Sequence, residues 1–284
     1  MTSGDVTAGQ LGRREPLVAA RQAASKVPQI TVFFWIIKIL TTAQGEATSD
    51  WLVYKVDPFL AVAIAGIILV VALALQFRAR RYRAWIYWFT VDMVAIFGTM
   101  AADGMHIKLG IAYSLSSSFF AVVLAVVLVC WYVTEKTLSI HSIRTRRREA
   151  FYWATVLSTF ALGTALGDMT ATTLHLGYLT SGIMFTLIFA VPGVAHRFLR
   201  LNAIAAFWFA YIVTRPLGAS YADWMGVPHS VGGLGFGRGP VAIVLTVPII
   251  AFVAYLAITR RDVEGEATAA AAAPSVPRHG RHRS

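Results

Sequence analysis

Long apolar runs separated by short polar connections follow one another along the chain. A helix needs about 20 residues to cross the hydrocarbon core of a bilayer, and eight runs approach or reach that length, near residues 31–50, 59–76, 85–103, 114–133, 152–171, 179–196, 203–222 and 240–258. The run "AVAIAGIILVVALAL" at 61–75 is apolar on every side, whereas a strand of a membrane barrel would alternate. The pattern predicts an all-α integral membrane protein with eight transmembrane helices.

A repeat underlies these runs. Four times, a tryptophan is followed by a glycine ten residues later and by an aspartate fifteen residues later: Trp35–Gly45–Asp50, Trp88–Gly98–Asp103, Trp153–Gly163–Asp168 and Trp208–Gly218–Asp223. Each instance opens an odd-numbered run, so the repeat unit is a pair of helices, at about 29–80, 81–145, 146–200 and 201–259. Because every unit crosses the membrane twice, we expect parallel repeats around an axis normal to the bilayer.

Within each unit, the polar side chains share one helical face. At 100° per residue, offsets 0, 4, 7, 11 and 15 from the tryptophan fall within about 80° of one another. These five positions form one stripe along the helix, and Lys38 lies off this stripe. The stripe carries the acids Glu46, Asp50, Asp92, Asp103, Asp168 and Asp223, the hydroxyls of Thr42, Thr99 and Thr164, and Arg215. A carboxylate facing lipid costs a few kcal/mol or more at the bilayer centre, so the stripes should face the interior of the bundle.

The rise of a helix sets the depth of each group. Fifteen residues span about 22 Å, so tryptophans anchored at the cytoplasmic headgroups would place the four aspartates toward the outer end. We expect Arg215 to be the counter-ion of Glu46 or Asp223, and the glycines to permit close helix packing. Alternatively, the aspartates only cap helix ends and hold the outer loops in shape.

The placement of basic residues decides what the net charge of +11 means. Most of the 25 lysines and arginines fall in the tails and the even-numbered connections, as in "RARRYR" at 78–83 and "RTRRR" at 144–148, and only Lys55, Lys108 and Arg238 fall in the odd-numbered ones. This bias predicts that both termini are cytoplasmic, with tails at 1–28 and, disordered, at 260–284 around a membrane domain at 29–259. It also argues against nucleic-acid binding.

Histidines offer a second set of candidate metal ligands. Three histidines, His106, His175 and His229, follow aspartates of the repeat on the outer side, close to methionines, and could form a transition-metal site, although their spacing is irregular. No arrangement of nucleophile, base and acid is found, so neither an enzyme nor a resident cofactor is predicted.

Together with the four Trp-x9-Gly-x4-Asp units, the segments "KVPQITVFFWIIKILTTAQGEATSDW" and "FWFAYIVTRPLGASYADW" carry a resemblance. Over roughly residues 27–258, the chain resembles a family of bacterial multi-pass membrane proteins. That family is built from a tandem two-helix repeat of unknown function with a characteristic tryptophan. The resemblance implies four repeats in a bacterial inner (cytoplasmic) membrane and names no substrate.

Two functions are consistent with these patterns. The first is a transporter for a cation, with a divalent metal such as Mn²⁺ as the leading candidate and protons as the coupling ion, because carboxylates and hydroxyls suit hard cations. Its predicted ligands are Glu46, Asp50, Asp103, Asp168 and Asp223, assisted by Thr42, Thr99 and Thr164. Asp92, Arg215 and Lys38 would relay or balance charge. The alternative is a non-transporting membrane scaffold or sensor, and the oligomeric state is left open.

Overall fold

The computed structural model describes residues 25–263, whose regular secondary structure is all helical, with no strand. The predicted all-α class is therefore confirmed, while the tail segments 1–24 and 264–284 lie outside the described residues. The eight long helices are α2 (Val32–Lys55), α3 (Pro58–Arg78), α4 (Ala84–Asp103), α5 (Tyr113–Glu135), α6 (Arg146–Asp168), α7 (Tyr178–Leu199), α8 (Ala203–Gly226) and α9 (Arg238–Thr259). Short helical turns link some of them: η1 (Gly104–Lys108), η2 (Ile140–Ser142), η3 (Met169–Thr173) and η4 (His229–Val231).

Six of these helices, α3, α4, α5, α6, α7 and α9, are long and apolar enough to cross a membrane. Helices α2 and α8 have 24 residues each but carry buried charges. Large apolar side chains such as Ile67, Val122, Leu187 and Val244 are each more than 60% exposed on the outer helices. Apolar faces of this extent fit contact with lipid rather than water, so the chain is a multi-pass membrane protein.

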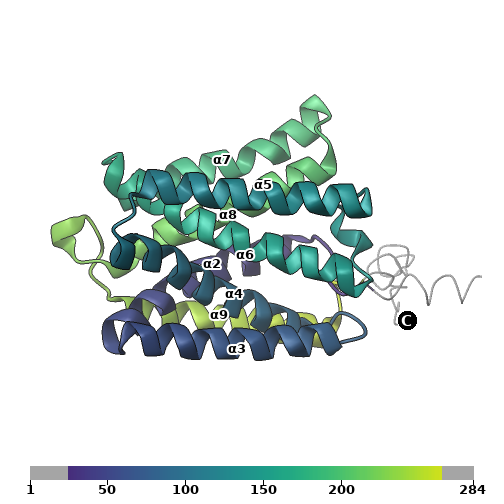
Figure 1. Ribbon diagram of the computed structural model, residues 1–284, viewed down its shortest axis with the longest axis horizontal. Helices are drawn as coiled ribbons and strands as arrows, with labels where there is room; N and C mark the ends of the chain where they lie inside the picture. Colours follow the sequence, from purple (N-terminus) through teal and green to yellow (C-terminus); the bar gives the residue numbers. More distant parts are fainter. Residues whose placement is uncertain (1–24, 264–284) are drawn as a thin grey trace, which may run out of the picture.

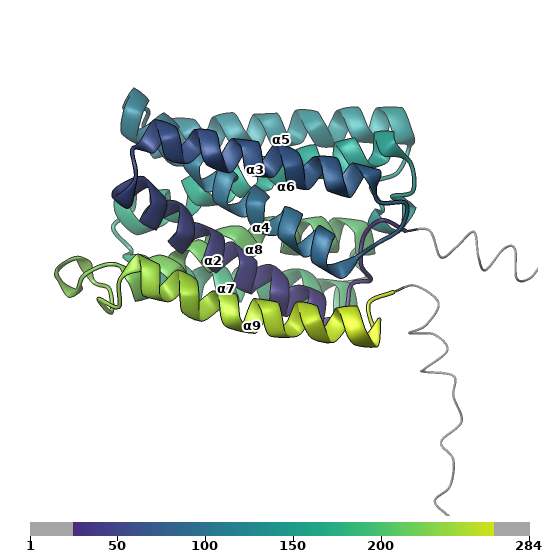
Figure 2. The same ribbon diagram turned by 90° about the horizontal axis from the view of Figure 1, so that it is seen from below.

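Four helices lie at the centre of the bundle, with α5 and α7 on one side and α3 and α9 on the other (Figures 1 and 2). Helices α2, α4, α6 and α8 pack side by side in a closed inner ring, and the other four lie outside it. The outer helix of each repeat packs on the inner helix of the next repeat: α3 on α4, α5 on α6, α7 on α8, and α9 back on α2. Because α2 and α3 barely touch, the repeat is a unit of sequence whose two helices interlock with the following unit.

The repeat glycines set the spacing of the inner ring. A Cβ atom added to Gly98 would lie 2.7 Å from the Cβ of Phe160, and one added to Gly218 would lie 2.9 Å from the backbone nitrogen of Ala43. Each glycine faces the residue seven positions after the tryptophan of the next inner helix, in the pairs Gly45–Ala95, Gly98–Phe160, Gly163–Arg215 and Gly218–Thr42. The prediction that these glycines permit close packing is confirmed.

Aromatic side chains close one end of the ring. The residue before each tryptophan contacts the tryptophan of the next inner helix, with ring centroids 5.6 Å apart in Phe34–Trp88, 5.7 Å in Tyr87–Trp153, 6.3 Å in Tyr152–Trp208 and 5.7 Å in Phe207–Trp35. We call these eight residues the aromatic plug. Trp88, Trp153 and Trp208 are at most 5% exposed, so their predicted role as headgroup anchors is wrong. Their rings fill the space between four helices instead.

Gly98→Ala should destabilise the ring, whereas Gly193→Ala should not. Overpacking a tight contact costs about 1–3 kcal/mol, and Gly98 lies against Phe160. Gly193, in the outer helix α7, has nothing within 4 Å of an added Cβ, so alanine there should gain up to ~1 kcal/mol from helix propensity. Thermal unfolding of both purified variants in detergent measures the difference. Equal stabilisation by both substitutions would contradict the packing role of Gly98.

Candidate functional site

One buried arginine connects all four inner helices. Arg215, on α8, is 0% exposed. Its guanidinium donates to the carboxylate of Glu46 on α2 at 2.5 Å and to the hydroxyl of Thr164 on α6 at 2.7 Å. It also donates to the hydroxyl of Thr99 on α4 and, at 3.0 Å, to the backbone carbonyl of Thr42 on α2. We call this group of five residues the arginine hub. Of the two counter-ions expected for Arg215, Glu46 is the one it contacts.

The hub occupies oxygen atoms that the sequence suggested as cation ligands. The hydroxyls of Thr99 and Thr164 accept from Arg215, and that of Thr42 donates to the carbonyls of Ile39 and Thr214, at 2.6 Å and 3.1 Å. A guanidinium therefore stands at the depth where these threonines were predicted to assist a cation. Four stripe residues, Glu46, Thr42, Thr99 and Thr164, are at most 2% exposed and face the bundle interior as predicted. The stripe acids Asp50, Asp92, Asp103 and Asp168 are partly exposed.

Acids gather beyond the hub, at the end of the ring opposite the aromatic plug. Carboxylate oxygens of Glu46, Asp50 and Asp103 all lie within 4.8 Å of one another, and among the described residues this is the only such group of three metal-ligating side chains. Two oxygens bound to one Ca²⁺-like ion at about 2.3 Å each stand no more than about 4.6 Å apart. The group is therefore close to the spacing that a hard cation requires.

The remaining repeat aspartates extend this acidic end. Asp103 and Asp168 directly precede the π-helical turns η1 and η3, and Asp223 is 7% exposed near the end of α8. Asp50 accepts from Arg238, at the start of α9, at 2.6 Å. Within residues 25–263, Asp103, Asp168 and Asp223 form no ion pair. The carboxyl groups at this end therefore outnumber the two arginines, Arg215 and Arg238.

Lys38 and Asp92 lie between the hub and the plug. Lys38 is 1% exposed, its Nζ has no hydrogen-bond partner among the described residues, and it stands 4.0 Å and 4.3 Å from the ring centroids of Phe160 and Tyr211. The quadrupoles of these rings attract a cation. One carboxylate oxygen of Asp92 is also buried without a partner in this part of the chain. Although Lys38 lies off the predicted stripe, the interior accommodates it.

The three histidines do not join the acidic group. The Nδ1 atom of His106 is 2.8 Å from the carbonyl of Ile111, that of His229 is 2.9 Å from the carbonyl of Gly233, and the side chain of His175 is exposed. None of them belongs to the three-carboxylate group. The transition-metal site stays a prediction without support from this arrangement.

A second buried ion pair was not predicted. At the plug end, Lys26 donates to Glu149 at 2.5 Å, and Gln76 donates to the other oxygen of Glu149 at 3.1 Å. Glu149 is 0% exposed. The sequence does hold a signal for it, because Glu149 precedes Trp153 by four residues and so shares its helical face.

Comparison with known proteins gives one match. The family model described as "Repeat of Unknown Function (DUF347)" matches the chain four times, at residues 33–82, 86–137, 151–201 and 206–262. Each matched segment holds one inner helix and the outer helix that follows it. No match was found among curated proteins or among solved structures.

Replacing Arg215 by methionine should destabilise the protein by about 3–5 kcal/mol, because it leaves the buried charge of Glu46 without a partner. The double substitution Arg215→Met with Glu46→Gln should recover part of this loss. Arg238→Met is the matched control, since Arg238 pairs with Asp50 at a partly exposed position. Thermal unfolding in detergent reports all three. A loss for Arg215→Met no greater than that for Arg238→Met would show that the hub does not hold the ring together.

Proposed function

This chain belongs to the Repeat of Unknown Function (DUF347) family, whose description names no activity, and we propose from its own side chains that it carries a cation across the membrane. The observation that carries the proposal is the group formed by Glu46, Asp50 and Asp103, whose carboxylate oxygens lie within 4.8 Å of one another. Hard divalent ions such as Mn²⁺ prefer oxygen ligands of this kind.

An excess of acid supports the same proposal. Asp168 and Asp223 add two carboxylates to those of the group. Like Asp103, they form no ion pair in the described residues, so Arg215 and Arg238 only partly neutralise this end. Keeping several carboxylates close together away from water is costly unless a cation or protons accompany them. In our proposal the transported metal ion compensates the negative charge of the carboxylates during one half of the transport cycle, and bound protons compensate it during the other half.

Arg215 acts in this proposal as a resident cation. While no metal is bound, its guanidinium satisfies Glu46. An arriving metal ion competes for the same carboxylate, so binding weakens the contact that ties α8 to α2. Loosening the hub would let the inner helices shift and open the aromatic plug, which closes the other end of the ring. Asp92, which lies between the hub and the plug with one carboxylate oxygen buried, is the proposed proton relay, with Lys38 balancing its charge.

The proposed membrane arrangement has eight spans, including the more polar α2 and α8, in four parallel two-helix units of an inner bacterial membrane. The described chain begins and ends at the same end of the bundle, since the backbone nitrogen of Gln29 donates to the carbonyl of Asp262 at 2.9 Å. Basic connections such as 78–83 flank that end, which we therefore place in the cytoplasm. The acidic end would then face outward.

Reconstituted protein should move Mn²⁺, and Asp103→Asn should slow this flux by about tenfold, a change of ~1.4 kcal/mol. The assay is uptake into liposomes across a panel of divalent ions, with a dye for internal pH to detect counter-moving protons. Asp57→Asn is the matched control, because Asp57 is an exposed cap of α3 and asparagine caps helices equally well.

The scaffold alternative makes the opposite prediction. If no cation of the panel moves and Asp103→Asn changes only the unfolding temperature, the acids tie the bundle together and the transport proposal is wrong. Equal flux in the Asp103→Asn and Asp57→Asn proteins would remove Asp103 from the pathway.

The orientation can be tested with single cysteines. In a Cys130→Ser background, an impermeant maleimide should label Ser230→Cys in intact spheroplasts and Arg80→Cys only after permeabilisation. Both positions are exposed, and they lie in connections that the charge bias assigns to opposite sides. The reverse labelling pattern would invert the proposed topology.

A further inference from the structure

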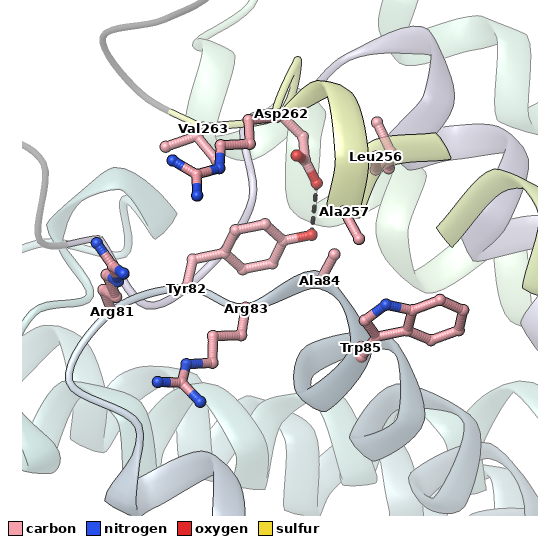
Figure 3. Close-up of a pocket in the computed structure, with 10 residues that line it drawn as sticks. Arg81, Tyr82, Arg83, Ala84, Trp85, Leu256, Ala257, Asp262 and Val263 are labelled. Atoms are coloured by element: carbon pink, nitrogen blue, oxygen red, sulfur yellow. Dashed lines mark hydrogen bonds between the residues drawn. The ribbon is translucent and has the colours of Figure 1, made fainter. Parts of the chain in front are cut away.

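A pocket of about 320 Å³ lies at the plug end of the bundle, away from the acidic group (Figure 3). One wall is formed by residues 81–85, where the α3–α4 connection leads into α4. The other is formed by the end of α9 and the residues just after it. The pocket thus joins two helices that are far apart in the sequence.

The accessible wall of this pocket is basic. Arg81, Arg83 and Arg260 line it, and Arg81 and Arg83 are exposed and form no ion pair within residues 25–263. One carboxylate, Asp262, also contributes, but it is 1% exposed and accepts from the hydroxyl of Tyr82 at 2.5 Å (Figure 3). Burial raises the pKa of Asp262.

Backbone donors supplement the arginines. Helix α4 begins at Ala84, and its cap residue, Arg83, provides no side-chain hydrogen bond to the first turn. The first N–H groups of a helix have no partner within the helix and carry its partial positive charge. Such an end binds anions, phosphate above all. The planar guanidinium of arginine suits the same oxygen atoms through paired hydrogen bonds.

The level of the pocket relative to the membrane indicates the source of the anion. Helices α4 and α9 both qualify as membrane spans, so their adjoining ends belong near the level of the lipid headgroups. Trp85, on the pocket wall, is 49% exposed, and an exposed tryptophan next to a span is typical of that level. Basic pockets between spans at this depth bind anionic headgroups.

We propose that this pocket binds a phosphate group, held by Arg81, Arg83 and the first N–H groups of α4. The bound anion would lie at the start of α4 and face the end of α9, the helix that packs back on α2. The site is separate from the acidic group, so it stands whether or not the protein moves a cation.

Binding to the full-length protein in detergent tests this site with two kinds of probe. Phosphatidylglycerol is compared with phosphatidylcholine by native mass spectrometry and thermal unfolding, and inorganic phosphate is titrated without added lipid. The test variant is R81Q/R83Q. The matched control is R146Q/R197Q, which removes the same charge at exposed positions away from the pocket. We expect R81Q/R83Q to bind about tenfold more weakly or worse, and the control to bind like the wild type.

The pattern of outcomes identifies the source of the phosphate. Loss of phosphatidylglycerol binding alone assigns the site to a lipid headgroup, and loss of inorganic phosphate binding assigns it to a soluble anion. If R81Q/R83Q binds every probe as the control does, or if no probe binds the wild type better than phosphatidylcholine does, the proposal is wrong. Unfolding without added ligand, which should be alike for both variants, verifies that the substitutions leave the fold intact.

Discussion

A single buried guanidinium constrains the rest of the structure. Arg215 is fully buried and contacts groups on α2, α4 and α6, and removing a charge from water costs several kcal/mol unless its partners stay in place. Those partners come from three helices and Arg215 itself from the fourth, so the inner ring must remain closed for the charge to be satisfied. The repeat glycines bring each inner helix against the next. The ring is therefore narrow enough for the side chain of Arg215 to reach the other three inner helices.

The two ends of the inner ring, on either side of Arg215, carry different kinds of side chain. The aromatic plug fills one end with rings 5.6 to 6.3 Å apart, and the acidic group occupies the other. Positions that build the ring are repeated in all four units, namely the tryptophan, the glycine and the aspartate. The charged residues Arg215, Glu46, Lys38 and Asp92 each occur in one unit only, at positions where the other units carry uncharged residues. The repeat thus supplies a scaffold, and single departures from it supply the chemistry at its centre.

The sequence predicted some parts of the site well and others poorly. Helical arithmetic placed Glu46, Thr99 and Thr164 on faces that point inward, and the pairing of Arg215 with Glu46 was one of two that it offered. It missed the interlocking of each outer helix with the following repeat, because periodicity describes which face of a helix is buried and not which helix covers it. It also missed Glu149 of the third repeat, because its partner Lys26 lies far away in the sequence, just before the first repeat.

The tryptophans show the limit most clearly. By itself the sequence determined the helical class, the repeat and the inward direction of the charged groups, since a charge facing lipid costs so much more than one facing a protein partner. Only the tertiary structure decided that Trp88, Trp153 and Trp208 fill the ring rather than face the headgroups. An apolar or aromatic side chain in a membrane gains nearly the same free energy from lipid as from protein. The sequence pattern of such residues therefore does not distinguish a side chain that faces lipid from one that faces protein. The packing between helices determines which of the two occurs.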